Sequence, residues 1–366
     1  MKKILILTAS FGEGHNSAAR GLRDGLALVG HDPSHVELHD LFAETYGAFN
    51  DLARRGYLAM ISSAPRMWSA LYRSLDRKKD FSKNFRLLFA VKHRLSALLA
   101  HFRPDVIVSV YPAYPHLLDE ILGRADGGSC RRIVIITDSI TVNSVWFRCS
   151  TDFFLVPNEA TADVLRQNEI PAGITKDFGF PVNPKFAEPG EVKVPPSDTS
   201  GRRVLYMINA AKATAPELVR RLIELSNVDL TVTVGRDARL RSAIENIRSE
   251  RDRNFEIVGW SEEMPRLMKE SHLLIGKAGG ATVQETIAAK TPMIINQVVP
   301  GQEEGNAQLI LQANAGAVAT SHDEVIAQIQ RSFADDARNW REWFANISAL
   351  SRPRASLDIA EFLLSM

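Results

Sequence analysis

Polar and acidic side chains follow a strand expected at residues 292–297. The stretch VVPGQEEGNAQ (298–308) has a turn signal at Pro300–Gly301, and it carries four side chains able to bind a ligand: Gln302, Glu303, Glu304 and Asn306. Carboxylates and amides can bind a metal ion, hydrogen-bond to hydroxyl groups, or simply face water in a turn. Taken alone, this stretch leaves all three interpretations open.

A second polar set lies one strand earlier, in IGKAGGATVQETIAAKTPMIINQ (275–297). A strand is expected to run into Gly279–Gly280, and Ala281–Thr282 to open a helix with Glu285 on its first turn. Glycines at a helix N-terminus bind phosphate through backbone N–H groups, and Lys277 would add positive charge. Glu285 would repel a phosphate and suits two ribose hydroxyls better. The alternative is a βα turn in which Glu285 caps its own helix.

The two loops are expected to lie together, because the carboxyl ends of neighbouring parallel strands meet at one edge of a sheet. A diphosphate with a ribose on one side and a sugar on the other would use both loops. A simple βα turn in the first loop would not explain why a second polar loop follows the next strand.

Two further candidates follow strands expected at 3–9 and 132–138. A helix starting near His15–Asn16 would place Gly14 and His15 at its N-terminus, where the free N–H groups form an anion site and a neutral imidazole could act as a base. Asp138 ends the second strand and could orient His15 or accept a proton itself. The alternatives are a glycine turn with a surface histidine and an aspartate that caps a turn.

These loops need parallel strands to position them. Nine runs that are apolar almost throughout alternate with helical patterns, as in βαβ units of sheets covered on both faces. The runs are 3–9, 105–110, 132–138, 152–157, 203–209, 229–235, 255–259, 272–277 and 292–297. The sequence therefore predicts an α/β fold with two doubly wound, Rossmann-like domains facing each other across a cleft.

The predicted domain limits follow from composition. The chain of 366 residues exceeds what one hydrophobic core usually serves, and a linker rich in proline, glycine and charge is expected at 183–203. We expect an N-terminal acceptor and membrane-binding domain at 1–185 and a C-terminal donor-binding domain at 200–337. A helical segment at 338–366, broken at Pro353, could pack back on the N-terminal domain.

Composition and missing motifs exclude several classes of function. The net charge of +1 argues against a nucleic-acid binder, and two cysteines make no disulfide framework, which favours a reducing compartment. No signal peptide and no membrane-spanning run is recognised, so we expect a cytoplasmic protein or one at a membrane surface. The P-loop, GxGxxG, HExxH and GxSxG motifs are absent, and no His/Cys cluster has metal-ligand spacing.

Residues 52–103 are strongly basic. They contain twelve Lys and Arg residues but only two acidic ones, interleaved with aromatic and aliphatic side chains such as Tyr57, Trp68 and Phe85. Such a pattern favours binding to an anionic membrane surface. A helical pair with a solvated basic face is the alternative, and nucleic-acid binding lacks a matching motif.

Five stretches occur in the order and spacing of one family: TASFGEGHNSAARGL, ITDSITVNSVWF, GFPVNPKF, KAGGATVQETIAAKTPMIINQ and PGQEEGNAQLI. The chain resembles the monogalactosyldiacylglycerol synthase and processive diacylglycerol β-glucosyltransferase group, and its second half is similar to the bacterial peptidoglycan N-acetylglucosaminyltransferase. The resemblance implies a GT-B fold and an inverting, metal-independent transfer of a hexose from a UDP-sugar to a diacylglycerol-type lipid. It places the reaction at the inner face of the cell membrane, with 52–103 as the lipid-acceptor region.

The resemblance also implies roles for single residues. His15 would be the base or the anchor of the transition state, with Asp138 beside it, and Glu285 would hold the ribose. The backbone at Trp260–Ser261 would frame the uracil. Gly279, Gly280, Ala281 and Thr282 would meet the diphosphate, and Gln302 and Glu303 the sugar hydroxyls. Lys277, for its charge, and Gly14, at the anion site of the first helix, are also expected to bind the donor. Glu304 is then expected to be solvated and Asn306 to stabilise the following helix. No metal and no cofactor is expected.

The sequence departs from the family pattern at two places. Asn143 stands three residues before a tryptophan, where the family usually has a histidine, and the loop MINAAKATAP (207–216) lacks its usual glycines, although Lys212 could supply charge. Two other functions therefore stay open: a UDP-sugar 2-epimerase-like enzyme and a catalytically altered UDP-sugar-binding sensor.

Overall fold

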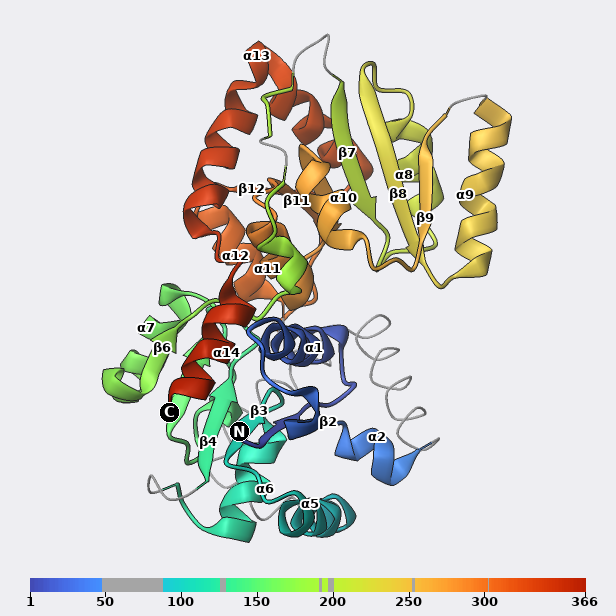
Figure 1. Ribbon diagram of the computed structural model, residues 1–366. Helices are drawn as coiled ribbons and strands as arrows, with labels where there is room; N and C mark the ends of the chain where they lie inside the picture. Colours follow the sequence, from blue (N-terminus) through green and yellow to red (C-terminus); the bar gives the residue numbers. More distant parts are fainter. Residues whose placement is uncertain (48–87, 126–129, 191–192, 197–200, 252–253, 302) are drawn as a thin grey trace. The chain divides into compact units, whose positions relative to one another are not determined.

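The computed structural model describes the chain apart from residues 48–87, 126–129, 191–192, 197–200, 252–253 and 302 (Figure 1). Its internal contacts divide it into two compact units. Unit 1 comprises residues 1–184, 299–305 and 354–366, and unit 2 comprises residues 185–298 and 306–353. Much of the basic segment at 52–103 thus lies outside the described residues.

Within its described residues, unit 1 is built on a six-stranded sheet in the order β2-β1-β3-β4-β5-β6, with all neighbouring strands parallel. The strands are β1 (Ile4–Leu7), β2 (Val36–His39), β3 (Val106–Ser109), β4 (Arg131–Ile135), β5 (Phe153–Val156) and β6 (Thr175–Asp177). The helices are α1 (Glu13–Leu28), α2 (Leu41–Tyr46), α5 (Phe89–Phe102), α6 (Ala113–Leu122), α7 (Glu159–Gln167) and α14 (Ala355–Ser365). β1 and β3 are buried along their whole length, as expected for strands covered on both faces.

Two apolar clusters in unit 1 hold helices against this sheet. One joins β1 and β3 to α2, α5 and α6, and the other joins β4 and β5 to α7 and to the short 3₁₀ helix η3 (Ser144–Trp146). These clusters fix the loops that follow β1 and β4, which carry His15 and Asp138.

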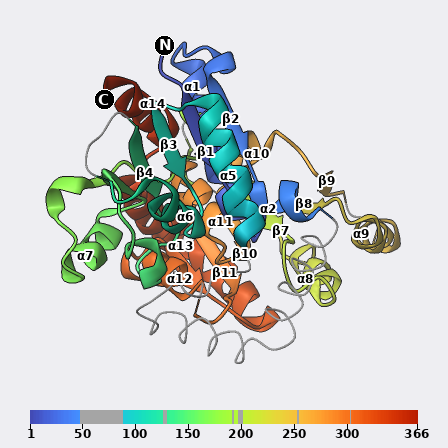
Figure 2. The same ribbon diagram turned by 90° about the horizontal axis from the view of Figure 1, so that it is seen from below.

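Helix α14 returns from the end of the chain and packs against α1, the first helix of unit 1 (Figures 1 and 2). The contact is close because α1 presents Gly25 to α14, while Gly21, one helical turn earlier, lies against the backbone of Pro181. A Cβ atom at Gly25 would lie 2.6 Å from the carbonyl oxygen of Ser356 in α14. Lys2 donates to the carbonyl oxygen of Leu364 at 2.9 Å and so binds the C-terminal end of α14.

Unit 2 has a second parallel sheet, whose described strands lie in the order β12-β11-β10-β7-β8-β9. They are β7 (Arg202–Met207), β8 (Val228–Gly235), β9 (Glu256–Gly259), β10 (Leu273–Lys277), β11 (Met293–Gln297) and β12 (Gly316–Val318). The helices are α8 (Ala215–Leu222), α9 (Ala238–Arg251), α10 (Met264–Glu270), α11 (Gly280–Ala288), α12 (Glu304–Gln312) and α13 (His322–Leu350). A large core joins the sheet to α8, α9 and α13.

The doubly wound α/β architecture predicted from the sequence is confirmed, and all nine predicted strands are present. The sequence missed β2, β6 and β12, which are edge strands of their sheets. An edge strand is covered less completely, so it lacks the continuous apolar run by which the central strands were recognised. β6 is the polar tripeptide TKD, and β12 has only three residues.

Residues Lys185, Lys193 and Val194 are fixed to unit 2 by three side chains. The ammonium of Lys193 is buried and donates to the carbonyl oxygens of Met268 and Ala289, which lie in the last turn of α10 and directly after α11. Lys269 donates to the carbonyl oxygen of Lys185 at 2.9 Å, and a ring nitrogen of His272 lies 3.1 Å from the carbonyl oxygen of Val194. The described start of the predicted linker is therefore an ordered part of this unit.

The predicted C-terminal segment is helical and is broken between residues 350 and 355, as expected around Pro353. The structure divides it between α13 of unit 2 and α14 of unit 1. Within α13, Asp335, Asp336 and Ala337 have φ values of 50–55° and interrupt the helix, which the sequence did not predict. Among the helices that the structure describes, none has the length and apolar character needed to cross a membrane.

Candidate functional site

The loop that presents His15 is anchored by Asp40, the residue before α2. One carboxylate oxygen of Asp40 accepts from the Ser10 backbone N–H at 2.8 Å and from the Ser10 hydroxyl at 2.6 Å. The other accepts from the Ala43 N–H at 2.9 Å and caps α2. The same carboxylate therefore ties the start of α2 to the loop after β1.

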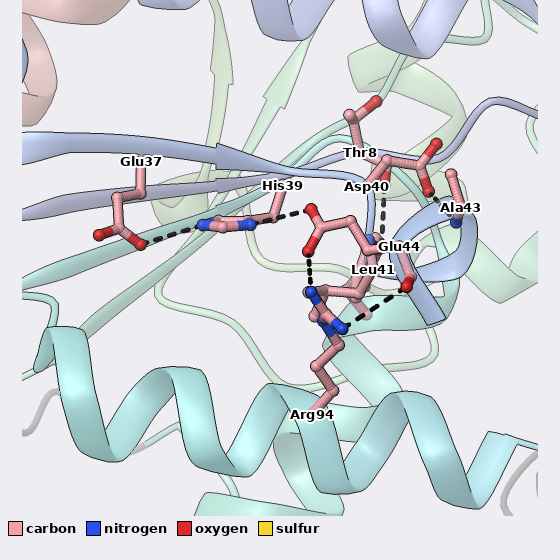
Figure 3. A network of polar contacts seen from close by, with 9 residues as sticks. Thr8, Glu37, His39, Asp40, Leu41, Ala43, Glu44 and Arg94 are labelled. Atoms are coloured by element: carbon pink, nitrogen blue, oxygen red, sulfur yellow. Dashed lines mark hydrogen bonds and ion pairs between the residues drawn. The ribbon is translucent and has the colours of Figure 1, made fainter. Parts of the chain in front are cut away.

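A chain of polar and charged side chains then ties α2 to β2 and α5 (Figure 3). The two ring nitrogens of His39 lie 3.0 Å from a Glu37 oxygen and 2.9 Å from a Glu44 oxygen. Arg94 of α5 donates to the other Glu44 oxygen at 3.0 Å. These contacts hold α2 and α5 in place, which precede and follow residues 48–87 in the sequence.

Helix α1 starts at Glu13, two residues before the predicted start near His15–Asn16. Gly12 is its N-cap and has φ 118°, a conformation that favours glycine. Gly14 therefore belongs to the first turn of α1, and so does His15. The glycine turn was correctly predicted, but the helix begins earlier because Gly12 alone supplies the unusual backbone angle.

The imidazole of His15 lies in an aromatic and polar environment within unit 1. Its Nδ1 is 3.0 Å from the hydroxyl oxygen of Thr137, and its ring centroid is 5.2 Å from that of Tyr111 and 5.8 Å from that of Trp146. Burial lowers the pKa of His15 to about 4, although a hydrogen bond to the Val110 backbone favours the protonated form. The ring is therefore neutral at neutral pH.

Asp138 lies three residues after the end of β4, so the strand is shorter than predicted. One of its carboxylate oxygens accepts from the indole N–H of Trp146 at 2.8 Å. Burial raises the pKa of Asp138 to about 6, against the lowering effect of that hydrogen bond. The side chain that hydrogen-bonds to His15 is Thr137, not Asp138, and Trp146 contacts both His15 and Asp138.

Asn143, at the position where the family has a histidine, caps the short helix η3. Its side chain is buried and accepts from the Val145 N–H at 3.1 Å. An asparagine at this place thus has a structural function in holding the turn that carries Trp146.

Residues 299–305 belong to unit 1 by their contacts, and the turn at Pro300–Gly301 is present, with φ 84° at Gly301. The Glu303 carboxylate is buried and accepts from the Val299 N–H at 3.1 Å, whereas Glu304 is exposed as predicted. Gln302 lies outside the described residues. Gly305 packs against the loop after β4, where its N–H donates to the Thr141 hydroxyl at 3.0 Å.

In unit 2, the glycine site was predicted at what is now seen to be the N-terminus of α11. The helix starts at Gly280 with Gly279 as its N-cap, and the lysine side chain that precedes it folds over this turn. A Cβ built at Gly279 would lie 3.6 Å from the Lys277 ammonium and 3.7 Å from the Thr282 hydroxyl. Free N–H groups of the helix and a positive charge therefore occur together, which suits an anion.

The predicted place of Glu285 on the first turn of α11 is wrong. Since the helix begins at Gly280, Glu285 lies on the second turn, and the first turn holds no acidic residue. Phosphate at this N-terminus would therefore not face a carboxylate on the first turn. The structure brings Lys277, Gly279, Gly280, Ala281 and Thr282 together at this place.

The predicted uracil position carries an exposed aromatic ring. Trp260 follows β9 and is 60% exposed, and the guanidinium of Arg236, which follows β8, lies 4.5 Å from the ring centroid. A cation over one face of an indole leaves the other available for stacking. Sequence reasoning named only the backbone here and missed Arg236.

Asn306, expected to stabilise the helix after the turn, lies inside that helix, which starts at Glu304. Its side-chain N–H group donates to the carbonyl oxygen of Ala278 at 3.0 Å, just before the glycine site. It therefore ties α12 to the loop after β10 within unit 2.

The loop after β7 contains no glycine, but one of its residues has the positive φ that glycine usually adopts. Ala211 has φ 50°, a conformation that L-residues rarely adopt, and it is exposed. Lys212, considered as a source of charge for phosphate, is paired with Asp237 at 2.8 Å. The loop also reaches the glycine site, because the Asn209 amide lies 3.4 Å from the Thr282 hydroxyl.

We expect Ala211→Gly to raise the free energy of unfolding of unit 2 by about 1 kcal/mol, because glycine adopts a positive φ without strain. The exposed Ala213 of the same loop provides the control, and Ala213→Gly should lower stability by about 0.5–1 kcal/mol through the entropy of the unfolded chain. Urea unfolding monitored by far-UV circular dichroism compares the two variants. A loss of stability in Ala211→Gly as large as in the control would contradict the strain at this residue.

Among the described residues, no three His, Cys, Asp or Glu side chains are grouped so that they could hold a metal ion. The positive groups found at the candidate anion site are the helix terminus and Lys277.

Comparisons with known proteins agree with this architecture. Residues 15–182 match the family model described as monogalactosyldiacylglycerol (MGDG) synthase, and residues 204–356 match the glycosyltransferase family 28 C-terminal domain. The chain is 24% identical to a processive diacylglycerol beta-glucosyltransferase of Bacillus subtilis, over 92% of this chain and 88% of that protein. It is 26% identical to monogalactosyldiacylglycerol synthase 2, chloroplastic, of Arabidopsis thaliana, over 98% of this chain and 80% of that protein.

Solved structures show the same fold. MurG of Acinetobacter baumannii superposes with a TM-score of 0.61 at 13% identity, over the full length of both chains. A UDP-GlcNAc 2-epimerase from Neisseria meningitidis, bound to UDP-GlcNAc, superposes with a TM-score of 0.59 at 13% identity, also over both full lengths.

The fold and these matches define a glycosyltransferase of the GT-B class. Within that class, the first half of the chain matches the MGDG synthase model and the second half matches the family 28 C-terminal domain. The predicted resemblance to the monogalactosyldiacylglycerol synthase and processive diacylglycerol β-glucosyltransferase group is confirmed.

Proposed function

We propose that this glycosyltransferase moves a hexose from a UDP-sugar to the hydroxyl of a diacylglycerol-type lipid, with inversion at the anomeric carbon. The observation that carries the donor assignment is the Lys277 ammonium folded over the N-terminus of α11. Backbone N–H groups and an ammonium can stabilise the charge that develops on a leaving diphosphate. The relatives named above support a lipid acceptor.

Asp138 is the base in this proposal. Its pKa of about 6 leaves it ionised at neutral pH and still basic enough to take a proton from the attacking hydroxyl. The lipid oxygen bonds to the anomeric carbon, the bond from that carbon to the diphosphate oxygen breaks, and the proton passes to the carboxylate while UDP departs.

His15 has a different part in the same step. With a pKa of about 4 it is a weak base at neutral pH, so its neutral ring serves as a hydrogen-bonding group at the reacting centre. Its contact with the Thr137 hydroxyl holds the ring in place. Of the two roles implied by the family resemblance, this assigns His15 that of the anchor.

Donor recognition completes the proposal. Gln302 and Glu303 bind hydroxyls of the sugar, Glu285 holds the ribose, and Trp260 receives the uracil on the ring face opposite Arg236. Gly14, in the first turn of α1, contributes a backbone N–H group to an anion or oxyanion site.

We further propose that the enzyme works in the cytoplasm at the inner face of the cell membrane and uses the basic segment 52–103 as its contact. The described part of this segment offers mixed support. Phe89, at the start of α5, is 74% exposed. However, Lys92 and Arg94 pair with Glu120 and Glu44, so these two positive charges are locally neutralised.

The proposal is tested with diacylglycerol liposomes and each of UDP-glucose, UDP-galactose and UDP-N-acetylglucosamine, with mass spectrometry of the extracted lipid. A glycolipid from one donor is the expected result. Conversion of a UDP-sugar to its C2 epimer without lipid would instead favour the epimerase, whose fold the chain shares. Binding of UDP with no product from any donor or acceptor would favour a sensor.

We expect Glu285→Ala to weaken UDP binding about tenfold or more, because a carboxylate that accepts from two ribose hydroxyls is lost. Glu245→Gln, which changes a carboxylate on the surface helix α9, is the control and should bind UDP like the wild type. Isothermal titration calorimetry with UDP gives both affinities. Equal affinities for the two variants would rule out the ribose assignment.

A further inference from the structure

We propose that Trp146 is a positioning residue that aims the Asp138 carboxylate at the acceptor hydroxyl, an inference that rests on the proposed function. The indole is buried, with 1% of the residue exposed, and its N–H donates to one carboxylate oxygen at 2.8 Å. In the described part of the chain this is the only hydrogen bond that the Asp138 side chain makes. The bond holds one oxygen and leaves the other to receive the proton.

The indole itself is held firmly within unit 1. Trp146 ends the short helix η3, and its backbone N–H donates to the Asn143 carbonyl oxygen at 3.0 Å. The Cys149 thiol lies 3.4 Å from the Trp146 carbonyl oxygen. With the Asn143 side chain capping the same turn, the backbone of Trp146 is fixed on both sides, so the ring has a defined place.

The ring also contacts both polar groups of this site. Its centroid lies 5.8 Å from that of His15, while its N–H contacts Asp138. Each of these two groups contacts the indole, and among the described residues no hydrogen bond joins His15 to Asp138. A direct bond between them would instead occupy the oxygen that the reaction needs.

Packing alone does not explain this arrangement, as Trp340 of unit 2 shows. Trp340 is buried to the same extent, and its N–H donates to the backbone carbonyl oxygen of His272 at 2.6 Å. A carbonyl group satisfies an indole without burying a charge. At Trp146 the partner is a carboxylate, whose burial disfavours its ionised form.

The hydrogen bond favours the ionised carboxylate and so opposes the effect of burial. The titratable groups around the indole and the imidazole are His15 of α1, Tyr111 after β3 and the Cys149 thiol. His15 is neutral at neutral pH, and burial raises the pKa of Cys149, so neither supplies a charge that could replace the indole N–H.

The test compares Trp146→Phe with the matched control Trp340→Phe, since each variant loses one indole N–H from a buried ring. In Trp146→Phe the acidic limb of the pH profile of kcat should move up by about one pH unit, because the ionised carboxylate loses its hydrogen bond. Trp340→Phe should lose stability but keep the wild-type limb. An unchanged limb in a folded, active Trp146→Phe would overturn the proposal.

A second measurement needs neither turnover nor a tryptophan variant. The chain has five tryptophans, and in protein labelled with 5-fluorotryptophan one ¹⁹F resonance should titrate near pH 6. That titration should vanish in Asp138→Asn. Seeing it in a protein without transfer activity would keep the positioning role and reject the proposed reaction. Transfer that needs Asp138 without any such titration would reject the positioning role alone.

Discussion

Asp138→Asn should make the protein more stable at pH 7.5 while lowering kcat for transfer about 10²–10⁴-fold, the usual contribution of a general base. The amide oxygen of asparagine can still accept from the Trp146 N–H, so the local structure is kept. The amide cannot take up a proton, and therefore the rate falls without a matching loss of donor binding.

The gain in stability follows from the direction of the pKa shift. The pKa of Asp138 is about 6 in the folded chain against an ordinary value of 3.8, so folding takes up a proton between these pH values. Stability is therefore lost as the pH rises from about 4 to 6 and stays lower above that range. A neutral asparagine avoids this loss, which amounts to about 2–3 kcal/mol at pH 7.5.

Asp152→Asn is the matched control in the same unit. The Asp152 carboxylate is largely buried and accepts from the Arg132 N–H at 2.7 Å and from the Arg131 guanidinium at 3.0 Å. Its replacement should lower the melting temperature and leave the rate per folded molecule unchanged. Calorimetry at pH 7.5 and single-turnover kinetics measure both effects. A loss of stability in Asp138→Asn like that of the control would contradict the unfavourable burial of Asp138. Unchanged activity would show that Asp138 is not the base.

The fold was predictable to the extent that burial leaves a mark in the sequence. The central strands are buried on both faces and therefore read as apolar runs, whereas β2 at the edge has the mixed sequence VELH and was missed. The break near Pro353 was predicted, because proline has a fixed effect on a helix. The left-handed residues at 335–337 were not, since no glycine marks them.

The sequence named candidate site residues but not the contacts that they make. His15 and Asp138 were found because each follows a strand, but the sequence could not show that Thr137 would meet His15. That contact depends on how α1 packs beside the loop after β4, and residues 122 positions apart carry no local signal of it. Trp146 could be noticed in the sequence, because it stands three residues after Asn143. Its hydrogen bond to Asp138 is visible only in the fold.

The closeness of α1 and α14 was likewise invisible in the sequence, and it leads to the second large effect that we expect. Gly21→Ala and Gly25→Ala should each destabilise unit 1 by about 2–4 kcal/mol, through the overpacking of a tight contact. A Cβ at Gly21 would lie 2.0 Å from the Pro181 carbonyl oxygen, and one at Gly25 would lie 2.6 Å from that of Ser356. Both obstacles are backbone atoms, so no side chain can turn aside. In Gly25→Ala, α14 must move away from α1, whereas in Gly21→Ala the backbone at Pro181 must move.

Gly173→Ala, in the same unit, separates this clash from the general effect of replacing glycine. A Cβ there would meet no atom within 4 Å, and Gly173 has no positive φ, so this variant should be neutral or slightly more stable. Hydrogen exchange then locates the damage. In Gly25→Ala the amides of α14 should lose protection first, while those of β3 stay protected, because α14 is held by α1 and by Lys2 at its end. Uniform loss of protection across unit 1 would mean that α14 is an integral part of its core, and a stability equal to that of Gly173→Ala would mean that the two helices are not in close contact.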